Sequence, residues 1–241
     1  MTKHWLFYSF SIMFLFSCGS ETNSNVNDSV PSASDSALQA QNLVANDKRN
    51  INDTVFHTAL PPVFDGDIIM QNCRLPQPQL LGLLMGGKYN HVGLIFKRDK
   101  DGLLMVMEML DSSRATPLTE FVDRGGGQVC LLRLKNASVT LNEEKTTKLR
   151  AATKAYRKKP FDPVLNWDDS GLYSSEVVWK VYNNAMMLKL CPTRTVKDFD
   201  ISEAQKKDLN KKYGMNVSDR DEAVSPDDIY NSPKLEIIFE K

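Results

Sequence analysis

The stretch YNHVGLIFKRDKDGLLMVMEML (residues 89–110) decides the fold class of this chain. Two runs in it, residues 90–96 and 103–110, are rich in apolar and β-branched residues and predict strands. Between them, DKDG (residues 99–102) predicts a tight turn. The two strands are therefore expected to pair as an antiparallel hairpin.

Further elements are expected on both sides of this hairpin. Strands are expected after the Asp65–Gly66 turn and at 128–135 and 234–240. Helices are expected at 76–86, 117–123, 141–158 and 174–188, with a short helical turn at 225–231 capped by Ser225. The stretch 201–222 is charged and weakly patterned. This order predicts an α+β fold with an antiparallel sheet.

The beginning of the chain has the layout of a secretory signal peptide. Lys3 precedes an apolar run from Trp5 to Phe16, which is short for a membrane-spanning helix of about 20 residues. The run ends in LFSC (residues 15–18), which resembles a bacterial lipobox and makes Cys18 the expected site of lipid attachment. The alternative is an ordinary cleaved signal peptide followed by a chance cysteine.

Composition divides the rest of the chain. Residues 18–55 are rich in Ser, Asn, Asp and Ala and contain no aromatic residue, which predicts a flexible stalk. Residues 56–241 are long enough for one domain with its own core. The expected organisation is thus a signal peptide at 1–17, a lipid-anchored stalk at 18–55, and a globular domain at 56–241. The protein is expected to be exported and held at the bacterial cell envelope, facing the periplasm or the surface.

Charge and cysteine usage exclude other classes. The chain has 30 basic and 30 acidic residues and no basic stripe, so nucleic-acid binding is not expected. Beyond Cys18 the cysteines are Cys73, Cys130 and Cys191, an odd number that does not indicate a disulfide framework. Their spacing does not fit metal ligands either, so neither a metal nor a cofactor is expected.

Histidines are scarce, which draws attention to His91. Of the three in the chain, only His91 lies inside an expected element. Glu108 lies in the next expected strand among apolar neighbours. If the strands pair, the carboxylate can orient the imidazole and stabilise its charged form. Two plainer readings stay open: a structural histidine within a sheet, and a carboxylate at a strand edge facing water.

Ser174 begins the strongest expected helix, in GLYSSEVVWKVY (residues 171–182). Serine is a preferred helix N-cap, so this position by itself favours a capping role. A helix N-terminus is also where enzymes place nucleophilic cysteines, because the helix dipole favours a thiolate.

Several short motifs together resemble the permuted papain-like amidases, the YiiX/YaeF-like branch of the NlpC-type cysteine hydrolases. They are DGDIIMQ (65–71), YNHVGLIF (89–96), VMEML (106–110), KPFDPVLNWDDSG (159–171), GLYSSEVVWKVY and SPDDIYNSP (225–233). The resemblance runs from Gly66 to Phe239. It implies a circularly permuted papain-like fold with a barrel-like antiparallel sheet packed against helices.

The resemblance also implies site residues. Histidine comes first in that family, as His91 does here, an acidic residue follows as Glu108, and the nucleophilic cysteine opens a helix. Ser174 stands in this chain where the family has that cysteine. A serine cannot form a resting thiolate–imidazolium pair and needs His91 as a general base during attack.

Three functions follow as hypotheses. The first is a hydrolase of amide, peptide or ester bonds that uses His91, Glu108 and Ser174. The second is a catalytically silent module of the same fold that binds a peptide, a cell-wall fragment or an acyl ligand. The third is a lipoprotein with a purely structural or assembly role. Ser174 is the residue that separates the first two.

Overall fold

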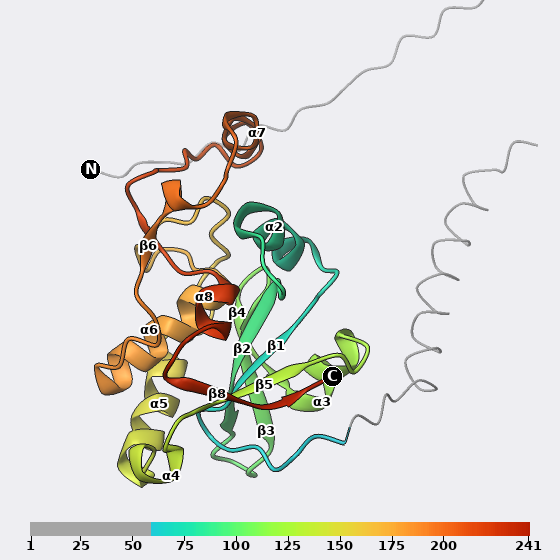
Figure 1. The fold of residues 1–241 in the computed structure, drawn as a ribbon, viewed down its shortest axis with the longest axis vertical. Coiled ribbons are helices and arrows are strands. Elements are labelled where there is room, and N and C mark those ends of the chain that lie inside the picture. The colour runs from blue at the N-terminus through green and yellow to red at the C-terminus, as the bar shows by residue number, and fades with distance from the viewer. Residues whose placement is uncertain (1–58) are drawn as a thin grey trace, which may run out of the picture. The chain divides into compact units, whose positions relative to one another are not determined.

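The computed structural model describes residues 59–241. The expected signal peptide, Cys18 and the whole expected stalk (18–55) lie outside the described residues. Antiparallel pairing joins six strands into one sheet in the order β4-β3-β2-β1-β5-β8 (Figure 1). These strands are β1 (Ile68–Gln71), β2 (His91–Lys97), β3 (Leu104–Met109), β4 (Ser113–Pro117), β5 (Cys130–Leu134) and β8 (Leu235–Glu240).

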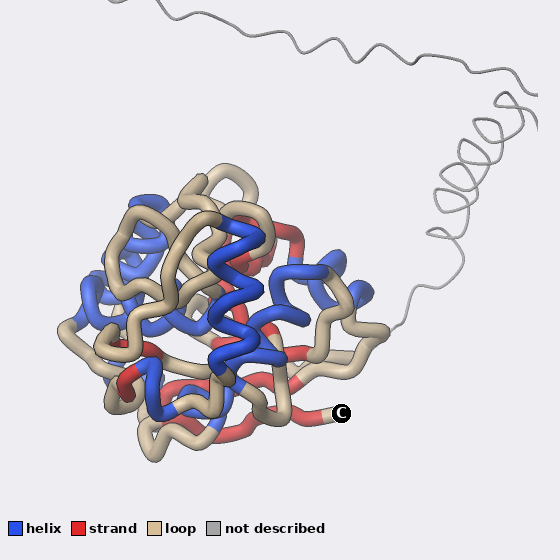
Figure 2. Tube along the Cα trace, turned by 90° about the horizontal axis from the view of Figure 1, so that it is seen from above, coloured by secondary structure: helices blue, strands red, loops and turns tan. Residues whose placement is uncertain are grey.

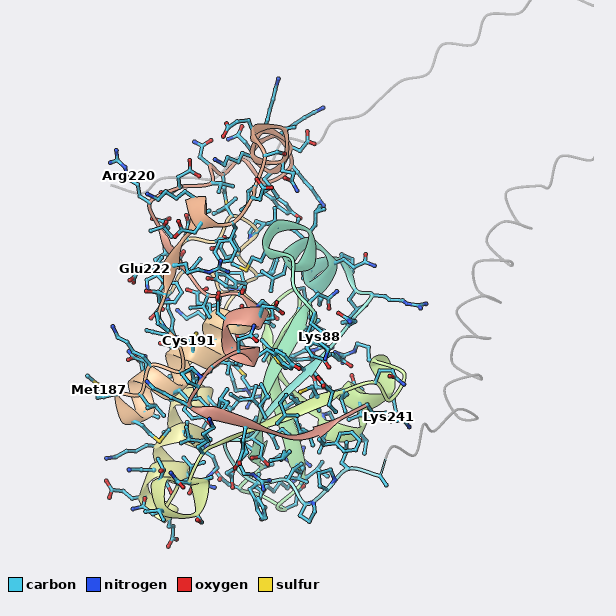
Figure 3. The ribbon with its side chains drawn as sticks, viewed as in Figure 1. Lys88, Met187, Cys191, Arg220, Glu222 and Lys241 are labelled. Carbon is cyan, nitrogen blue, oxygen red and sulfur yellow. The ribbon has the colours of Figure 1, made fainter. Side chains whose placement is uncertain are left out.

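Helices and a small second sheet complete the described chain. The helices are α2 (Pro76–Met85), α3 (Leu118–Arg124), α4 (Ala137–Thr140), α5 (Glu143–Ala155), α6 (Ser174–Met186), α7 (Glu203–Tyr213) and α8 (Pro226–Tyr230). A 3-10 turn covers Val196–Asp198, and β6 (Arg194–Thr195) pairs with β7 (Glu222–Ala223). The view from above shows helices and loops surrounding the strands (Figure 2). Met187, which follows α6, projects from the outer edge of the domain (Figure 3).

The sheet stays open, so the expected barrel-like closure is wrong. Its edge strands are β4 and β8, which do not pair with each other. The edge of β4 is instead met by the segment that leads toward α6: Ser113 donates its backbone N–H to Lys159, and Lys158 donates to Ser113. The backbone groups of Ser113 at this edge are therefore paired by a segment outside the sheet.

Two cores cover the two faces of the sheet. One lies under α6 and is lined by Ile68, Met70, Val92, Leu94, Val177, Val178 and Val181, among others. The other lies under α3 and is lined by Ile69, Ile95, Val106, Leu118, Phe121, Val122 and Leu131, among others. Successive residues of a strand point to opposite faces, so β1, β2, β3 and β5 each contribute to both cores. His91 has the parity of Ile95 and therefore faces α3.

Most expected elements are present with ends shifted by a few residues. The hairpin of β2 and β3 forms through the turn that ends at Gly102, and Asp228 donates its backbone N–H to the Ser225 hydroxyl as expected for a cap. The helix expected at 141–158 is the single helix α5, preceded by the separate short helix α4. No helix of the described part of the chain is long and apolar enough to cross a membrane.

Candidate active site

His91 and Glu108 form a buried pair. Leu94 on β2 lies opposite Met107 on β3, and this register puts His91 and Glu108 on the same face in diagonal positions. His91 Nε2 lies 2.8 Å from Glu108 Oε2, and both side chains are fully buried. The expected pairing on adjacent antiparallel strands is therefore present, and Glu108 does not face water.

Glu108 is held by more groups than the imidazole alone. The Thr116 hydroxyl donates to its Oε1 at 2.5 Å, and Arg124 Nη1 donates to its Oε2 at 2.6 Å. Arg114 Nε lies 3.6 Å from Oε1. Burial by itself would raise the pKa of Glu108, but the hydrogen bonds and charge of His91 and Arg124, with the Thr116 hydrogen bond, outweigh it and lower the pKa to about 2. The carboxylate is thus ionised and fixed in place.

The imidazole of His91 is also held in place by an aromatic side chain. Its ring stacks on Phe121 of α3 with centroids 5.3 Å apart. Gly93, two residues along β2, keeps this space open, since a Cβ there would lie 2.3 Å from Val106 Cγ1 and 3.5 Å from the Phe121 ring. With Nε2 committed to Glu108, the other ring nitrogen, Nδ1, is buried and has no hydrogen-bond partner. A nitrogen in this state is available to take a proton.

Ser174 is the first residue of α6, but it does not cap the helix. The N-cap is Tyr173, whose backbone N–H donates to Glu176 Oε2 at 3.3 Å. The Ser174 hydroxyl is buried and makes no hydrogen bond, so the capping role that its position favours is wrong. A buried hydroxyl without a partner is costly, which is more typical of a functional position than of a structural one.

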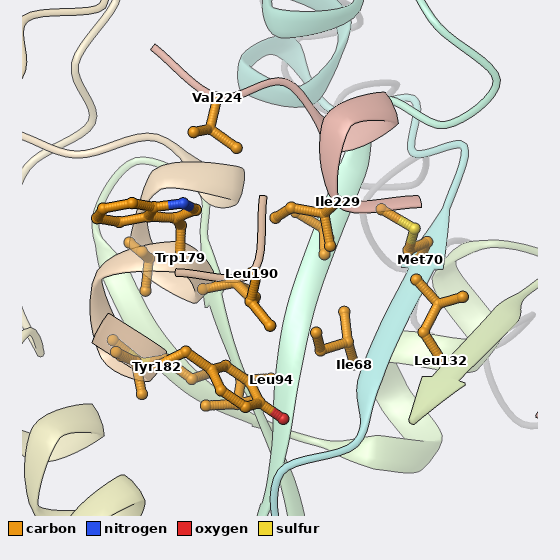
Figure 4. Packing of buried hydrophobic residues seen from close by; sticks show 14 of the residues in the cluster. Ile68, Met70, Leu94, Leu132, Trp179, Tyr182, Leu190, Val224 and Ile229 are labelled. Carbon is orange, nitrogen blue, oxygen red and sulfur yellow. The ribbon is translucent and has the colours of Figure 1, made fainter. Parts of the chain in front are cut away.

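The start of α6 lies toward the end of the sheet where β2 begins. The Tyr182 hydroxyl, late in α6, donates to the backbone oxygen of Gly66, and Gly66 in turn donates its N–H to Ile95 near the other end of β2. Figure 4 shows Tyr182 near Leu94 and Trp179 farther from it, and Ser174 comes before Trp179 in α6. Ser174 thus lies toward the sheet end that carries His91, but α6 covers the opposite face of the sheet from α3, which His91 faces, and no hydrogen bond joins the two side chains.

A cluster of ionisable side chains that was not predicted from the sequence supports the start of α6. Lys180 Nζ lies 2.7 Å from Glu176 Oε1 and 2.7 Å from Asp169 Oδ1. Burial raises the pKa of Glu176 to about 8, although the charge of Lys180 works in the opposite direction. The spacing of Glu176 and Lys180 by four residues was the available signal. The cluster ties the segment before α6 to its first two turns.

Burial disfavours the thiolate form of each of the described cysteines. Burial raises the pKa of Cys130 and of Cys191 to about 12. Burial also raises the pKa of Cys73, which lies near Arg124 and Glu108. The described cysteines are free and buried. A competing thiol nucleophile is therefore not prepared at any of the three positions.

Comparison with known proteins gives consistent matches. The family described as "Permuted papain-like amidase enzyme, YaeF/YiiX" matches residues 63–239. The uncharacterized protein YiiX of Escherichia coli (strain K12) is 33% identical over 172 residues, which cover 70% of this chain and 83% of that protein. The crystal structure of the metalloprotein YiiX from Escherichia coli O157:H7 aligns with a TM-score of 0.64 and 31% sequence identity, and the alignment covers 73% of this chain and 97% of that one.

The word metalloprotein in that description belongs to the Escherichia coli protein. Within residues 59–241 of the present chain, no group of three or more His, Cys, Asp and Glu side chains is placed to hold a metal ion. The ring nitrogen His91 Nε2 is already bonded to Glu108. The described residues therefore do not fit a resident metal.

The family match covers more than two thirds of the chain, and the fold is shared with the solved relative. The chain therefore belongs to the permuted papain-like amidases of the YaeF/YiiX type.

Proposed function

We propose that the domain is a hydrolase of amide, peptide or ester bonds that acts through Ser174, His91 and Glu108. The observation that carries this proposal is the pattern of hydrogen bonding in the buried site. Glu108 occupies one nitrogen of the imidazole, the other nitrogen has no partner, and the Ser174 hydroxyl has none either. An acyl-transfer reaction uses these two groups, a hydroxyl as the nucleophile and a ring nitrogen as the base.

In the proposed reaction the Ser174 oxygen attacks the carbonyl carbon of the substrate while its proton passes to His91 Nδ1. The carboxylate of Glu108 stabilises the imidazolium that forms. Backbone N–H groups at the start of α6 hold the developing oxyanion. The imidazolium then gives its proton to the leaving group. Water attacks the acyl-serine, again with His91 as the base, and releases the acid. Hydrogen bonds of this kind often tighten only when substrate binds, so their absence in the free protein is compatible with this route.

The alternative is a binding module of the same fold, and Ser174 is the observation that favours it. A hydroxyl is far less acidic than a thiol, and a site shaped for sulfur positions oxygen less well. Such a module would take the same ligands, a peptide, a cell-wall fragment or an acyl group, and leave them intact.

Labelling with a fluorophosphonate separates the two functions. If Ser174 is an activated nucleophile, the wild-type protein becomes labelled, because the probe phosphonylates serines that an adjacent base deprotonates. The modification is read on the peptide that contains Ser174 by mass spectrometry. Ser174→Ala and His91→Ala should each abolish it, whereas Ser175→Ala at the neighbouring serine should retain it. A wild-type protein that stays unlabelled would leave the binding module as the function of this chain.

We also propose that the protein is a lipoprotein of the cell envelope, anchored through Cys18. The apolar run that ends in LFSC and the polar stretch after it support this. Mass spectrometry of the mature N-terminus is expected to show an acylated Cys18, since several acyl chains together give stable membrane anchoring. Cys18→Ser should release the protein from the membrane fraction. A mature N-terminus elsewhere, without lipid, would contradict the anchor.

A further inference from the structure

A basic hollow of about 260 Å³ lies between α5 and the hairpin of β2 and β3. Its floor is apolar and includes Phe96, Met105 and Ala115, which the strand register puts on one face of the sheet. Its walls carry one acidic side chain, Asp99, and six basic ones: Lys97, Arg98, Lys100, Arg150, Lys154 and Arg157. The whole chain has equal numbers of basic and acidic residues, so this excess of positive charge is local.

The hollow lies apart from the candidate active site. His91 is the first residue of β2 and Lys97 is the last, and a strand of this length spans about 20 Å. His91, Glu108 and Ser174 are not among the residues that line the hollow. A ligand bound here would therefore not depend on chemistry at Ser174.

A carboxylate of the protein itself already shows that the hollow stabilises an anion. Asp99 Oδ2 lies 2.6 Å from Lys154 Nζ, and Asp99 Oδ1 lies 3.4 Å from Arg150 Nε. The hydrogen bond and charge of Lys154, with the charge of Arg150, lower the pKa of Asp99. Two cations four residues apart on α5 thus converge on one anion. Arg150 also bonds Asp65, and Arg98 bonds Asp101.

The other three cations of the hollow have no such partner. Within residues 59–241, the side chains of Lys97, Lys100 and Arg157 form no hydrogen bond and no ion pair. Positive charges gathered beside an apolar floor repel one another more strongly than they would in open water, because the local dielectric constant is lower. Binding of an anion would relieve this repulsion.

The number of free cations favours a phosphate group over a carboxylate. A carboxylate supplies one negative charge, whereas a phosphate monoester carries about 1.5 to 2 negative charges near pH 7 and three strong acceptor oxygens. The planar guanidinium of Arg157 can bond two of these oxygens, and the ammonium groups of Lys97 and Lys100 act as point charges.

We propose that this hollow binds the phosphate group of a phosphomonoester through Lys97, Lys100 and Arg157, with Asp99 as a competing internal anion. Its volume lies below the range of about 300–1,000 Å³ that is usual for pockets of drug-sized ligands. The hollow therefore holds the phosphate and the atoms next to it, and the rest of the ligand stays outside. A soluble phosphomonoester and the headgroup of a lipid share this chemistry.

Titration of the full-length protein with glycerol 3-phosphate, followed by NMR, tests the proposal. The backbone amide signals of Lys97 and Arg157 should shift with a dissociation constant below about 1 mM, and the signal of His91 should stay in place. Glycerate, a carboxylate of similar size, should bind at least about tenfold more weakly. No shift with glycerol 3-phosphate, or equal binding of glycerate, would contradict the proposed ligand.

Two variants assign the binding to these side chains. The double variant Lys97→Gln/Arg157→Gln should bind glycerol 3-phosphate at least about tenfold more weakly than the wild type. The matched control is Lys207→Gln/Lys211→Gln, which removes the same charge from two exposed lysines of α7 and should leave the affinity unchanged. The proposal is wrong if the two double variants bind equally well.

Asp99→Asn changes the affinity in the opposite direction. Removing this carboxylate frees Arg150 and Lys154, so glycerol 3-phosphate should bind at least about threefold more tightly. A gain of affinity cannot result from loss of folding. An affinity that is unchanged or lower in Asp99→Asn would show that the hollow does not bind the phosphate.

A short-chain lipid separates the two sources of the phosphate. Dihexanoyl phosphatidic acid, used below its micellar concentration, carries the same phosphomonoester on a lipid. If it shifts the same signals and binds at least about tenfold more tightly than glycerol 3-phosphate, the ligand is a lipid headgroup, and equal affinities indicate a soluble phosphomonoester. Binding of either that survives in Lys97→Gln/Arg157→Gln would overturn the proposal. These outcomes are independent of Ser174, so they leave the proposed hydrolase function to its own test.

Discussion

Ser174→Cys is expected to carry the most reactive thiol of the described domain near neutral pH. The substitution puts a thiol at the N-terminus of α6, where the helix dipole and His91 both favour its ionised form. Its pKa is expected to fall from about 8.5 to below about 7.5, which makes a substantial fraction thiolate at neutral pH. Cys130 and Cys191, whose pKa burial raises to about 12, are almost wholly protonated there. The new thiol should react with iodoacetamide at least about a hundredfold faster than either.

Rates are measured residue by residue, by mass spectrometry of peptides after timed alkylation. His91→Ala in the Ser174→Cys background should slow the reaction at position 174, because the imidazolium that stabilises the thiolate is gone. The matched control is Ser175→Cys, one residue further along α6. The native Ser175 hydroxyl is fully buried and donates to the backbone of Val224, so a thiol there has no reason to ionise. A thiol at position 174 that is no faster than the one at 175 would show that the site does not activate a nucleophile.

The sequence predicted the hairpin of β2 and β3 because local signals and tertiary structure agree there. Apolar, β-branched strands and an Asp-Gly turn are enough to define both the pairing and the face shared by His91 and Glu108. β4 (Ser113–Pro117) was missed because its sequence, SRATP, has no apolar alternation and ends in proline. Tertiary contacts stabilise its strand conformation. It pairs with β3, and its backbone hydrogen-bonds residues 158–159.

The candidate site also contains some residues that could be predicted from the sequence and others that could not. His91 and Glu108 could be identified from scarcity and from an acidic residue among apolar ones. Arg124 and Thr116 could not, because they reach Glu108 only once α3 and β4 have packed against β3. Gln71 lies within DGDIIMQ (65–71), but an unpaired amide is a property of the packed structure and has no signature in the sequence. For Ser174, helix-capping preference gave the wrong role, since Tyr173 occupies the N-cap.

Glu108→Gln is expected to destabilise the domain by about 3 kcal/mol near pH 7. Glu108 is an ionised, fully buried carboxylate that accepts hydrogen bonds from Thr116 and Arg124 and pairs with His91. An amide of the same shape removes the negative charge and leaves Arg124, which is 16% exposed, without its closest anion. Urea unfolding of both proteins gives the difference in the free energy of unfolding. Glu120→Gln is the matched control: Glu120 bonds the same arginine at 3.2 Å but is 56% exposed, so it should cost less than about 1 kcal/mol.

The pH dependence identifies the carboxylate as the cause. Folding lowers the pKa of Glu108 from 4.5 to about 2, so the unfolded chain binds a proton at this residue over a range where the folded protein does not. The stabilisation by Glu108 is therefore fully present above about pH 4.5 and is lost as the pH falls toward about 2. Glu108→Gln lacks this titration. The difference in the free energy of unfolding between the wild-type protein and Glu108→Gln should decrease steadily when urea unfolding is repeated at pH values from about 5 down to about 3. If this difference in the free energy of unfolding stays constant over that range, the variant is destabilised by altered packing. The ionised carboxylate would then not hold His91 in the way the structure indicates.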